Sequence, residues 1–250
     1  VLCEKPIAEN EDQAEEMIQA MSATGKGFFI AFVYRFSPIA QTLKHWFHSG
    51  VIGDVKSIRM VYNWNLHGQW VQDEKGAWIE SSMWKGRMLE GGPMIDCGVH
   101  MIDLVRWISG EEIVEAAGHG AWVSNYEAAD HVYAHLESES GIHGMVEVSF
   151  TYGHTAKFPA PQFTYELIGT GGVAKYDRNG YLLEARNGEG IIKGPSEGEK
   201  NFDGMWNAFC HYIRTGEAGD LASPGDALEA TRIALETTPR RIPVVVASKK

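Results

Sequence analysis

One stretch of the sequence spaces acidic and imidazole side chains as a proton-transfer site would require. In GGPMIDCGVHMIDLVRWISG, residues 91–110, Asp96 and His100 stand four residues apart in a segment that predicts a helix. That spacing places both side chains on one helical face, and Asp103 and Trp107 follow on the same face. A carboxylate one turn before an imidazole can orient the ring and raise its basicity, so the pair could transfer a proton. The alternative is an ordinary helical pair on a solvated face, and Asp103 and Trp107 are expected to be structural.

A second candidate is Lys5, which stands before a proline in VLCEKPIAEN, residues 1–10. The apolar start of this stretch predicts a strand, and its polar end opens a helical pattern. A lysine directly after a strand of a parallel sheet lies at the carboxyl end of that sheet, where α/β folds bind ligands. Burial beside a cofactor would lower the pKa of its ammonium toward neutrality. The alternative is a solvated lysine at a strand end.

The composition and charge favour some classes of protein and argue against others. The chain has 250 residues, of which 44% are hydrophobic and 22% charged, as in globular proteins with one large or two modest domains. A net charge of -11 argues against a nucleic-acid surface, which needs a basic stripe. No apolar run approaches the roughly 18 residues of a membrane span. The three cysteines are far apart in the sequence, which favours a reducing compartment and predicts a cytoplasmic protein.

The elements that must position these residues divide the chain into two parts. Residues 1–36 predict strand, helix, strand, with the second strand in 27–36, which is one βαβ unit of a parallel sheet. Pro38 is expected to open another helix. Beyond it, strands are predicted over 56–65, 113–123, 131–137, 142–152, 162–169, 173–177, 181–186 and 240–250, with helices over 92–109, 203–215 and 225–237. The expected fold is an α/β remnant followed by an α+β domain on a large, mainly antiparallel open sheet flanked by helices.

The sequence gives weaker evidence for other kinds of site. Ten histidines suggest a metal site, but there is no HExxH motif, and His131 and His135 would lie about 13 Å apart along a strand. Asp96 and His100 could bind a divalent ion only with ligands from elsewhere, so no metal is expected. The sequence has no GxSxG elbow and no Walker loop. The tryptophans and glycines of 64–92 could form a carbohydrate-facing rim or could simply pack a loop onto the sheet.

Four segments, in this order, resemble one family. They are EKP at 4–6, YRFSP at 34–38, HSGVIGDVKSI at 48–58 and GGPMIDCGVHMIDLVRWISG at 91–110, and they are similar to motifs of the glucose-fructose oxidoreductase / inositol dehydrogenase / rhizopine-catabolism (Gfo/Idh/MocA) family. SPGDALEA at 223–230 resembles the late helix of that family, so the resemblance covers nearly the whole chain.

The resemblance implies a Rossmann domain that binds NAD or NADP, of which residues 1–36 are the C-terminal remnant. It implies a substrate-binding and oligomerisation domain over 37–250, whose late helix at 225–237 packs back on the Rossmann side. The implied substrate is a sugar, a polyol or a related hydroxy compound. The implied assembly is a homodimer or homotetramer formed through the open sheet.

The same resemblance implies roles for individual residues. His100 would take the proton from the substrate hydroxyl as hydride leaves the same carbon for the nicotinamide. Asp96 would orient His100, and Lys5 would polarise the substrate oxygen. The peptide bond between this lysine and the following proline is frequently cis in the family. The residues expected to contact the cofactor are Glu4, Lys5, Pro6 and Arg35.

Two departures from the family pattern bear on these expectations. The pattern usually has a third glycine, but here Glu90 precedes Gly91 and Gly92, and Pro93 follows, which would alter the approach to the substrate pocket. The Gly-rich turn that precedes EKP in the family has no counterpart, because GTGG at 169–172 is expected to join two late strands. The chain is therefore expected to begin on a late Rossmann strand and to be inactive alone. The alternatives are a non-catalytic sugar-binding or regulatory module and a metal-dependent lyase or isomerase.

Overall fold

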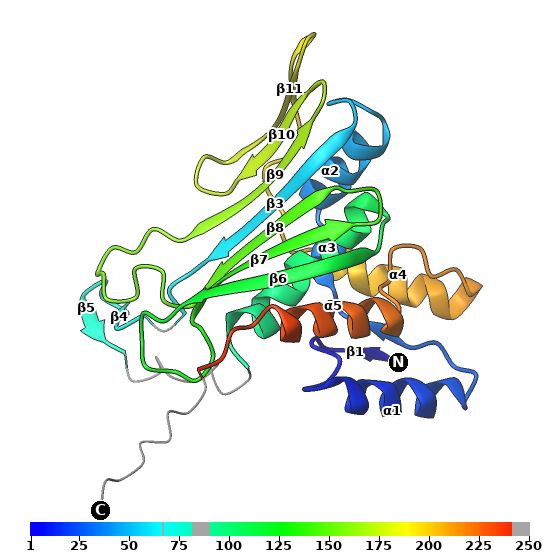
Figure 1. Ribbon diagram of the computed structural model, residues 1–250, viewed down its shortest axis with the longest axis horizontal. Coiled ribbons are helices and arrows are strands. Elements are labelled where there is room, and N and C mark those ends of the chain that lie inside the picture. The colour runs from blue at the N-terminus through cyan, green and yellow to red at the C-terminus, as the bar shows by residue number, and fades with distance from the viewer. Residues whose placement is uncertain (67, 82–90, 242–250) are drawn as a thin grey trace, which may run out of the picture.

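An eight-stranded sheet dominates the computed structural model, which describes residues 1–66, 68–81 and 91–241 (Figure 1). Its spatial order is β12-β11-β10-β9-β3-β8-β7-β6; β3 and β8 are parallel, and the other neighbouring pairs are antiparallel. The strands are β3 (Val55–Asn63), β6 (Ile113–Ala121), β7 (His131–Ser138), β8 (His143–Ser149), β9 (Gln162–Gly169), β10 (Gly172–Asp177), β11 (Leu182–Asn187) and β12 (Gly190–Lys193). The predicted α+β fold, with a mainly antiparallel open sheet flanked by helices, is confirmed.

The apolar side chains of the strands face a layer of helices. In β3, Ile58, Met60 and Tyr62 are buried whereas Arg59 is exposed, as the alternation in the sequence predicts. The helices against this face include α2 (Pro38–His48) and α3 (Val99–Ser109). Every residue of α3 is buried, so this helix is enclosed on all sides and its polar side chains need partners inside the protein.

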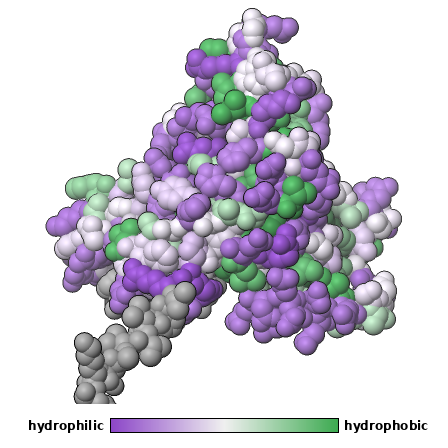
Figure 2. All heavy atoms as spheres, viewed as in Figure 1, coloured by the Kyte–Doolittle hydropathy of each residue, from purple (hydrophilic) through white to green (hydrophobic). Residues whose placement is uncertain are grey.

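The N-terminal residues form the predicted strand-helix-strand unit. Strands β1 (Leu2–Cys3) and β2 (Phe29–Ile30) pair in parallel, and α1 (Glu11–Ser22) connects them. The side chain of Asn10 caps α1 by accepting a hydrogen bond from the backbone N–H of Gln13. Figure 2 shows a hydrophilic surface at the lower right, where α1 lies. The exposed acidic residues of this helix are Glu11, Asp12, Glu15 and Glu16.

Two late helices complete the layer, where the sequence predicts them. They are α4 (Phe202–Thr215) and α5 (Pro224–Glu236). Ser223 and Asp226 form a capping box at the start of α5, with proline at its first position. Helix α5 contacts α1 and β2 on one side and α3 on another, so it links the N-terminal unit to the helix that carries the candidate site.

Three segments differ from the prediction. The apolar run 27–36 is a strand only at β2, and a 3-10 helix (Val33–Phe36) follows it. Nearly the whole run is buried, so its hydrophobicity could not distinguish a strand from a helix. Segment 64–92, expected to form a rim or a loop, contains a hairpin, β4 (Trp70–Gln72) and β5 (Trp78–Glu80), and β12 was not predicted. In the predicted last strand, residues 242–250 lie outside the described residues, as do residues 67 and 82–90 of segment 64–92.

None of the helices in the described ranges combines the length and the hydrophobicity that a membrane crossing requires.

Candidate active site

Lys5 and Asp96 meet although 91 residues separate them in the sequence. Lys5 follows β1, and its Nζ donates to Oδ1 of Asp96 at 2.6 Å and to the backbone oxygen of Asp96 at 2.5 Å. The two side chains are only 15% and 5% exposed, so the pair is largely shielded from water. The Lys5–Pro6 peptide bond is cis, as the resemblance implies. Glu4, at the same strand end, is exposed.

Asp96 is positioned by an irregular turn before α3. Residues Met94–Gly98 form one π-helical turn, which runs into α3 at Val99. The turn begins after Gly91 and Gly92, whose φ angles of 103° and 94° lie in the region that favours glycine. A π turn is wider than an α-helical turn, so the side chains of Asp96 and His100 do not have the relative direction expected of one α-helical face. Glu90 lies outside the described residues, so its effect on the approach to the site stays a prediction.

His100 lies in the first turn of α3 and is 6% exposed. The rings of Phe32 and Tyr34 meet it edge to face, with centroid distances of 5.6 and 4.8 Å. Burial, followed by the positive charges of Lys5 and Lys200, holds the pKa of His100 well below its usual value, and the charge of Asp96 opposes this effect. The imidazole is therefore neutral at neutral pH and able to accept a proton. Because Asp96 and His100 are both buried, the alternative of a pair on a solvated face is wrong.

Two buried polar atoms of this region lack hydrogen-bond partners within the described ranges. They are Nδ1 of His100 and the hydroxyl group of Tyr165, whereas the hydroxyl group of Tyr34 interacts with Tyr62. Phe163 stacks on Tyr34 and contacts Tyr165, so the two tyrosines belong to the same aromatic cluster. Burial raises the pKa of both tyrosines, so their hydroxyl groups stay protonated and can donate. Buried polar atoms without partners are rare, and a ligand or water is their usual explanation.

This tyrosine cluster is not predicted by any motif in the sequence. Tyr34 belongs to the YRF motif, but Tyr165 lies on β9, opposite Met60 of β3. The pairing of β3 with β9 and the contact with Phe163 place Tyr165 in this cluster, and that pairing is not readable from the spacing of residues.

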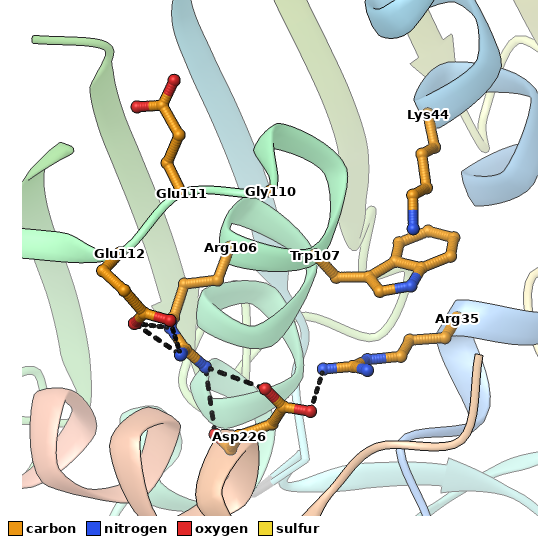
Figure 3. Close-up of a pocket in the computed structure, with 8 residues that line it drawn as sticks. All are labelled: Arg35, Lys44, Arg106, Trp107, Gly110, Glu111, Glu112 and Asp226. Atoms are coloured by element: carbon orange, nitrogen blue, oxygen red, sulfur yellow. Dashed lines mark hydrogen bonds and ion pairs between the residues drawn. The ribbon is translucent and has the colours of Figure 1, made fainter. Parts of the chain in front are cut away.

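Arg35 lies in a separate ionic network. Its Nε donates to Asp103 at 2.9 Å and its terminal nitrogen to the same carboxylate at 2.5 Å, and Asp226 lies 3.3 Å away. This network borders a cavity of about 270 Å³ near the C-terminal end of α3, whereas His100 lies near the start of that helix. Figure 3 shows Arg35 and Arg106 both directed at Asp226. The charged groups around this cavity are Arg35, Lys44, Arg106, Glu111, Glu112 and Asp226, which balance in sign.

The structure therefore brings together Lys5, Asp96 and His100, and it places Arg35 elsewhere. Asp103 and Trp107 have structural partners, since Asp103 binds Arg35 and the indole N–H of Trp107 donates to Asp220 at 3.1 Å.

Two further expectations concern cofactors. GTGG at 169–172 joins β9 to β10 in an antiparallel hairpin, as predicted, and is not a dinucleotide-binding turn. Within the described part of the chain, no three His, Cys, Asp or Glu side chains are arranged to hold a metal ion.

Comparison with known proteins supports one family. Residues 40–175, more than half of the chain, match the GFO/IDH/MocA C-terminal domain. Scyllo-inositol 2-dehydrogenase (NAD(+)) of Bacillus subtilis is 27% identical over 183 residues, which are 69% of this chain and 46% of that protein. D-glucoside 3-dehydrogenase of Escherichia coli is 27% identical over 168 residues, 60% of this chain and 45% of that protein. The chain thus spans about half the length of the curated relatives it matches.

Comparison of the fold with solved structures identifies proteins of the same kind. An oxidoreductase from Agrobacterium radiobacter, solved in complex with NAD+, L-tartaric acid and magnesium, superposes with a TM-score of 0.73 at 18% identity. The superposition covers 96% of this chain and 72% of that chain. The sequence match and the shared fold agree, and the chain belongs to the GFO/IDH/MocA family of oxidoreductases.

Proposed function

We propose that this chain supplies the substrate-binding domain and the proton-transfer site of an NAD(P)-dependent dehydrogenase. The substrate would be a sugar, a polyol or a related hydroxy compound, as the names of the Bacillus subtilis and Escherichia coli relatives suggest. The observation that carries the proposal is the buried Lys5–Asp96 pair beside a neutral, buried His100. Residues 1–36 would belong to the dinucleotide-binding domain and residues 37–250 to the substrate domain.

His100 is the proposed general base. Oxidation of an alcohol releases the hydroxyl proton as hydride leaves the carbon, and a neutral imidazole can accept that proton. Its Nδ1 has no partner in the described structure, so a substrate hydroxyl would satisfy a buried polar atom. The hydroxyl group of Tyr165 is a further buried atom that a hydroxyl-rich ligand, or water beside it, would satisfy.

Lys5 and Asp96 would orient the substrate oxygen. An ammonium group has three N–H donors, and Asp96 accepts two of them through its carboxylate and its backbone oxygen. The third donor can bind the oxygen on which negative charge develops as the proton leaves. Asp96 would then act by holding the ammonium in place and by raising the pKa of His100, although burial and lysine charges outweigh this effect.

The residues at the end of β1 fit the nicotinamide end of a dinucleotide. NAD(P), when bound, supplies the hydride acceptor. Glu4, Lys5 and Pro6 would hold it, because they follow the strand at the carboxyl edge of the small parallel sheet, and two of the three donors of Lys5 are used within the described residues. The guanidinium of Arg35 is occupied by Asp103 and Asp226, so Arg35 would influence the cofactor only through the elements it holds together.

Assembly through the sheet is part of the same proposal. The face of the sheet away from the helices exposes apolar side chains, among them Tyr133 on β7 and Ile168 on β9. Covering such side chains with a second copy would remove apolar surface from water. A homodimer or homotetramer formed through this face is the proposed assembly.

Turnover tests the proposal. The purified protein that contains these 250 residues would be incubated with NAD+ or NADP+ and a panel of inositols, hexoses and glycosides, while reduced nicotinamide is followed by absorbance. We expect turnover of at least one hydroxy compound, and a loss of roughly 100-fold or more in kcat/KM for His100→Asn. The matched control is His45→Asn, because His45 is exposed on α2 and should leave the rate unchanged. Binding without turnover, or a His100→Asn variant as fast as the parent, would contradict the proposal.

A further inference from the structure

Lys200 lies beside the candidate site without a carboxylate partner in the described structure. Its Nζ is 5.4 Å from the centre of the Tyr34 ring, and that ring contacts the imidazole of His100 with a centroid distance of 4.8 Å. One aromatic ring therefore separates the ammonium group from the proposed base. The charge of Lys200 acts on His100, since it is one of the causes that lower the pKa of the imidazole.

The neighbours of Lys200 in the chain hold it at this place. Glu199 accepts a hydrogen bond from the Nε of Arg178 at 2.7 Å and another from the hydroxyl group of Tyr176. Asn201 caps α4 through Gly204, and its Nδ2 donates to the backbone oxygen of Phe36 at 3.0 Å. The backbone is thus fixed on both sides of Lys200, so the position of this lysine is determined by the fold although its side chain is exposed.

The charges around the site leave this lysine uncompensated. Lys5 pairs with Asp96, and Arg178 pairs with Glu199, so each of these ion pairs is neutral overall. Lys200 adds one positive charge at the same place, in a chain whose net charge is -11. A cation that has no carboxylate partner among the described residues and lies beside a reactive site attracts an anionic group from solution.

We propose that Lys200 binds a carboxylate or phosphate group of the substrate, so that the preferred substrate is an anionic sugar derivative rather than a neutral polyol. The inference rests on the proposed function, because it assigns the substrate class of the same site. Both anions suit an ammonium, which acts as a point charge and does not select between their shapes. The ring of Tyr34 lies between Lys200 and His100, so the anionic group would be several bonds from the reacting carbon.

Anion binding would also act on the proposed base. A carboxylate or phosphate on Lys200 offsets a charge that disfavours protonation of His100. The substrate would therefore raise the basicity of the imidazole that accepts its proton. A neutral sugar would have no such effect.

Three ligands of one scaffold test the proposal. Binding of D-glucose, D-glucuronate and D-glucose 6-phosphate to the purified protein would be measured by isothermal titration calorimetry. We expect an anionic ligand to bind more tightly than glucose, and Lys200→Gln to weaken that binding by roughly 10- to 100-fold. Glucose itself should bind both proteins alike. Comparing the affinity for D-glucuronate with that for D-glucose 6-phosphate then identifies whether the site binds a carboxylate or a phosphate.

Lys193→Gln is the matched control, because Lys193 is an exposed lysine on β12 and should leave all three affinities unchanged. Lys200→Glu should abolish the preference for anions. The proposal is overturned if wild-type protein binds no anionic ligand more tightly than glucose, or if Lys200→Gln keeps the wild-type affinities. If neutral hydroxy compounds are turned over with dependence on His100 while Lys200→Gln has no effect, the proposed function stands and only the assignment of Lys200 fails.

Discussion

The ion pair between Arg35 and Asp103 offers a sharp test of where the structure places Arg35. The two side chains are 6% and 1% exposed and are joined by two hydrogen bonds. Removing one member leaves a buried charge without its partner, whereas replacing both by apolar residues removes the charge and the need for it together. A cycle of Arg35→Met, Asp103→Leu and the double variant separates these effects.

The expected magnitudes follow from the remaining partners. Arg35→Met leaves Asp103 buried without its bidentate partner, which should cost about 4 kcal/mol in the free energy of unfolding. Asp103→Leu should lower the free energy of unfolding by about 3 kcal/mol, because Arg35 still has Asp226 as a partner at 3.3 Å, and that carboxylate is 32% exposed. The double variant should lose about 3 kcal/mol or less, well below the sum of the single losses.

Urea unfolding of the parent and the three variants measures these energies. Tryptophan fluorescence and far-UV circular dichroism would be recorded together, since coincident transitions support the two-state treatment. Arg232→Met is the exposed control: Arg232 is 38% exposed, and its ion pairs on α5 should contribute less than about 1 kcal/mol. Additive effects, or single losses below about 1 kcal/mol at Arg35, would refute the structural assignment and would favour direct cofactor contact by this arginine.

Three further predictions concern packing, capping and acid stability. Gly118→Ala should destabilise the protein by about 1–3 kcal/mol, because the added carbon would lie 2.0 Å from the backbone oxygen of Thr237. In the control Gly188→Ala the added carbon meets nothing within 4 Å, so the stability should change by less than about 0.5 kcal/mol. Equal thermal midpoints of the two variants would contradict this prediction. Ser223→Ala should cost about 1 kcal/mol by removing the cap of α5, to be read from urea midpoints. The pKa of Glu147 is lowered from 4.5 to about 2, chiefly by His131, whose Nε2 lies 3.4 Å from the carboxylate, and by hydrogen bonds from Asn63 and Arg59. Its stabilisation of up to about 3 kcal/mol is therefore present above pH 4.5 and lost as the pH falls toward 2, so Glu147→Gln should flatten acid unfolding in this range.

Local patterns predicted much of the fold correctly. The strand predicted over 56–65 corresponds to β3 and the helix predicted over 225–237 to α5, because these patterns depend on residues close in sequence. The buried run 27–36 has no polar face opposite an apolar one, so its change from strand to 3-10 helix could not be predicted from the sequence. The π turn at Met94–Gly98 was also unpredictable, since glycine at 91 and 92 signals flexibility but not the width of the turn.

The candidate site, like the fold, could be predicted from the sequence only in part. The resemblance identified Lys5, Asp96 and His100, and the structure places Lys5 and Asp96 in direct contact beside a buried imidazole. The contributions of Tyr165 and Lys200 depend on sheet pairing and on the path of the chain before α4, which are long-range features. Arg35 shows the limit of a motif, because its partners Asp103 and Asp226 come from elements that the motif does not contain.

The most direct test of the proposed proton-transfer site is the titration of the His100 imidazole by NMR, in the parent protein and in Lys5→Met. We expect a pKa below the ordinary histidine value of about 6.5, because the ring is buried and the charges of Lys5 and Lys200 act on it. In Lys5→Met the pKa should rise, since one positive charge is lost and the carboxylate of Asp96 is no longer neutralised by the lysine. A parent pKa at or above about 6.5, or no change on removing the lysine, would contradict the claim that Lys5, Asp96 and His100 form one proton-transfer site.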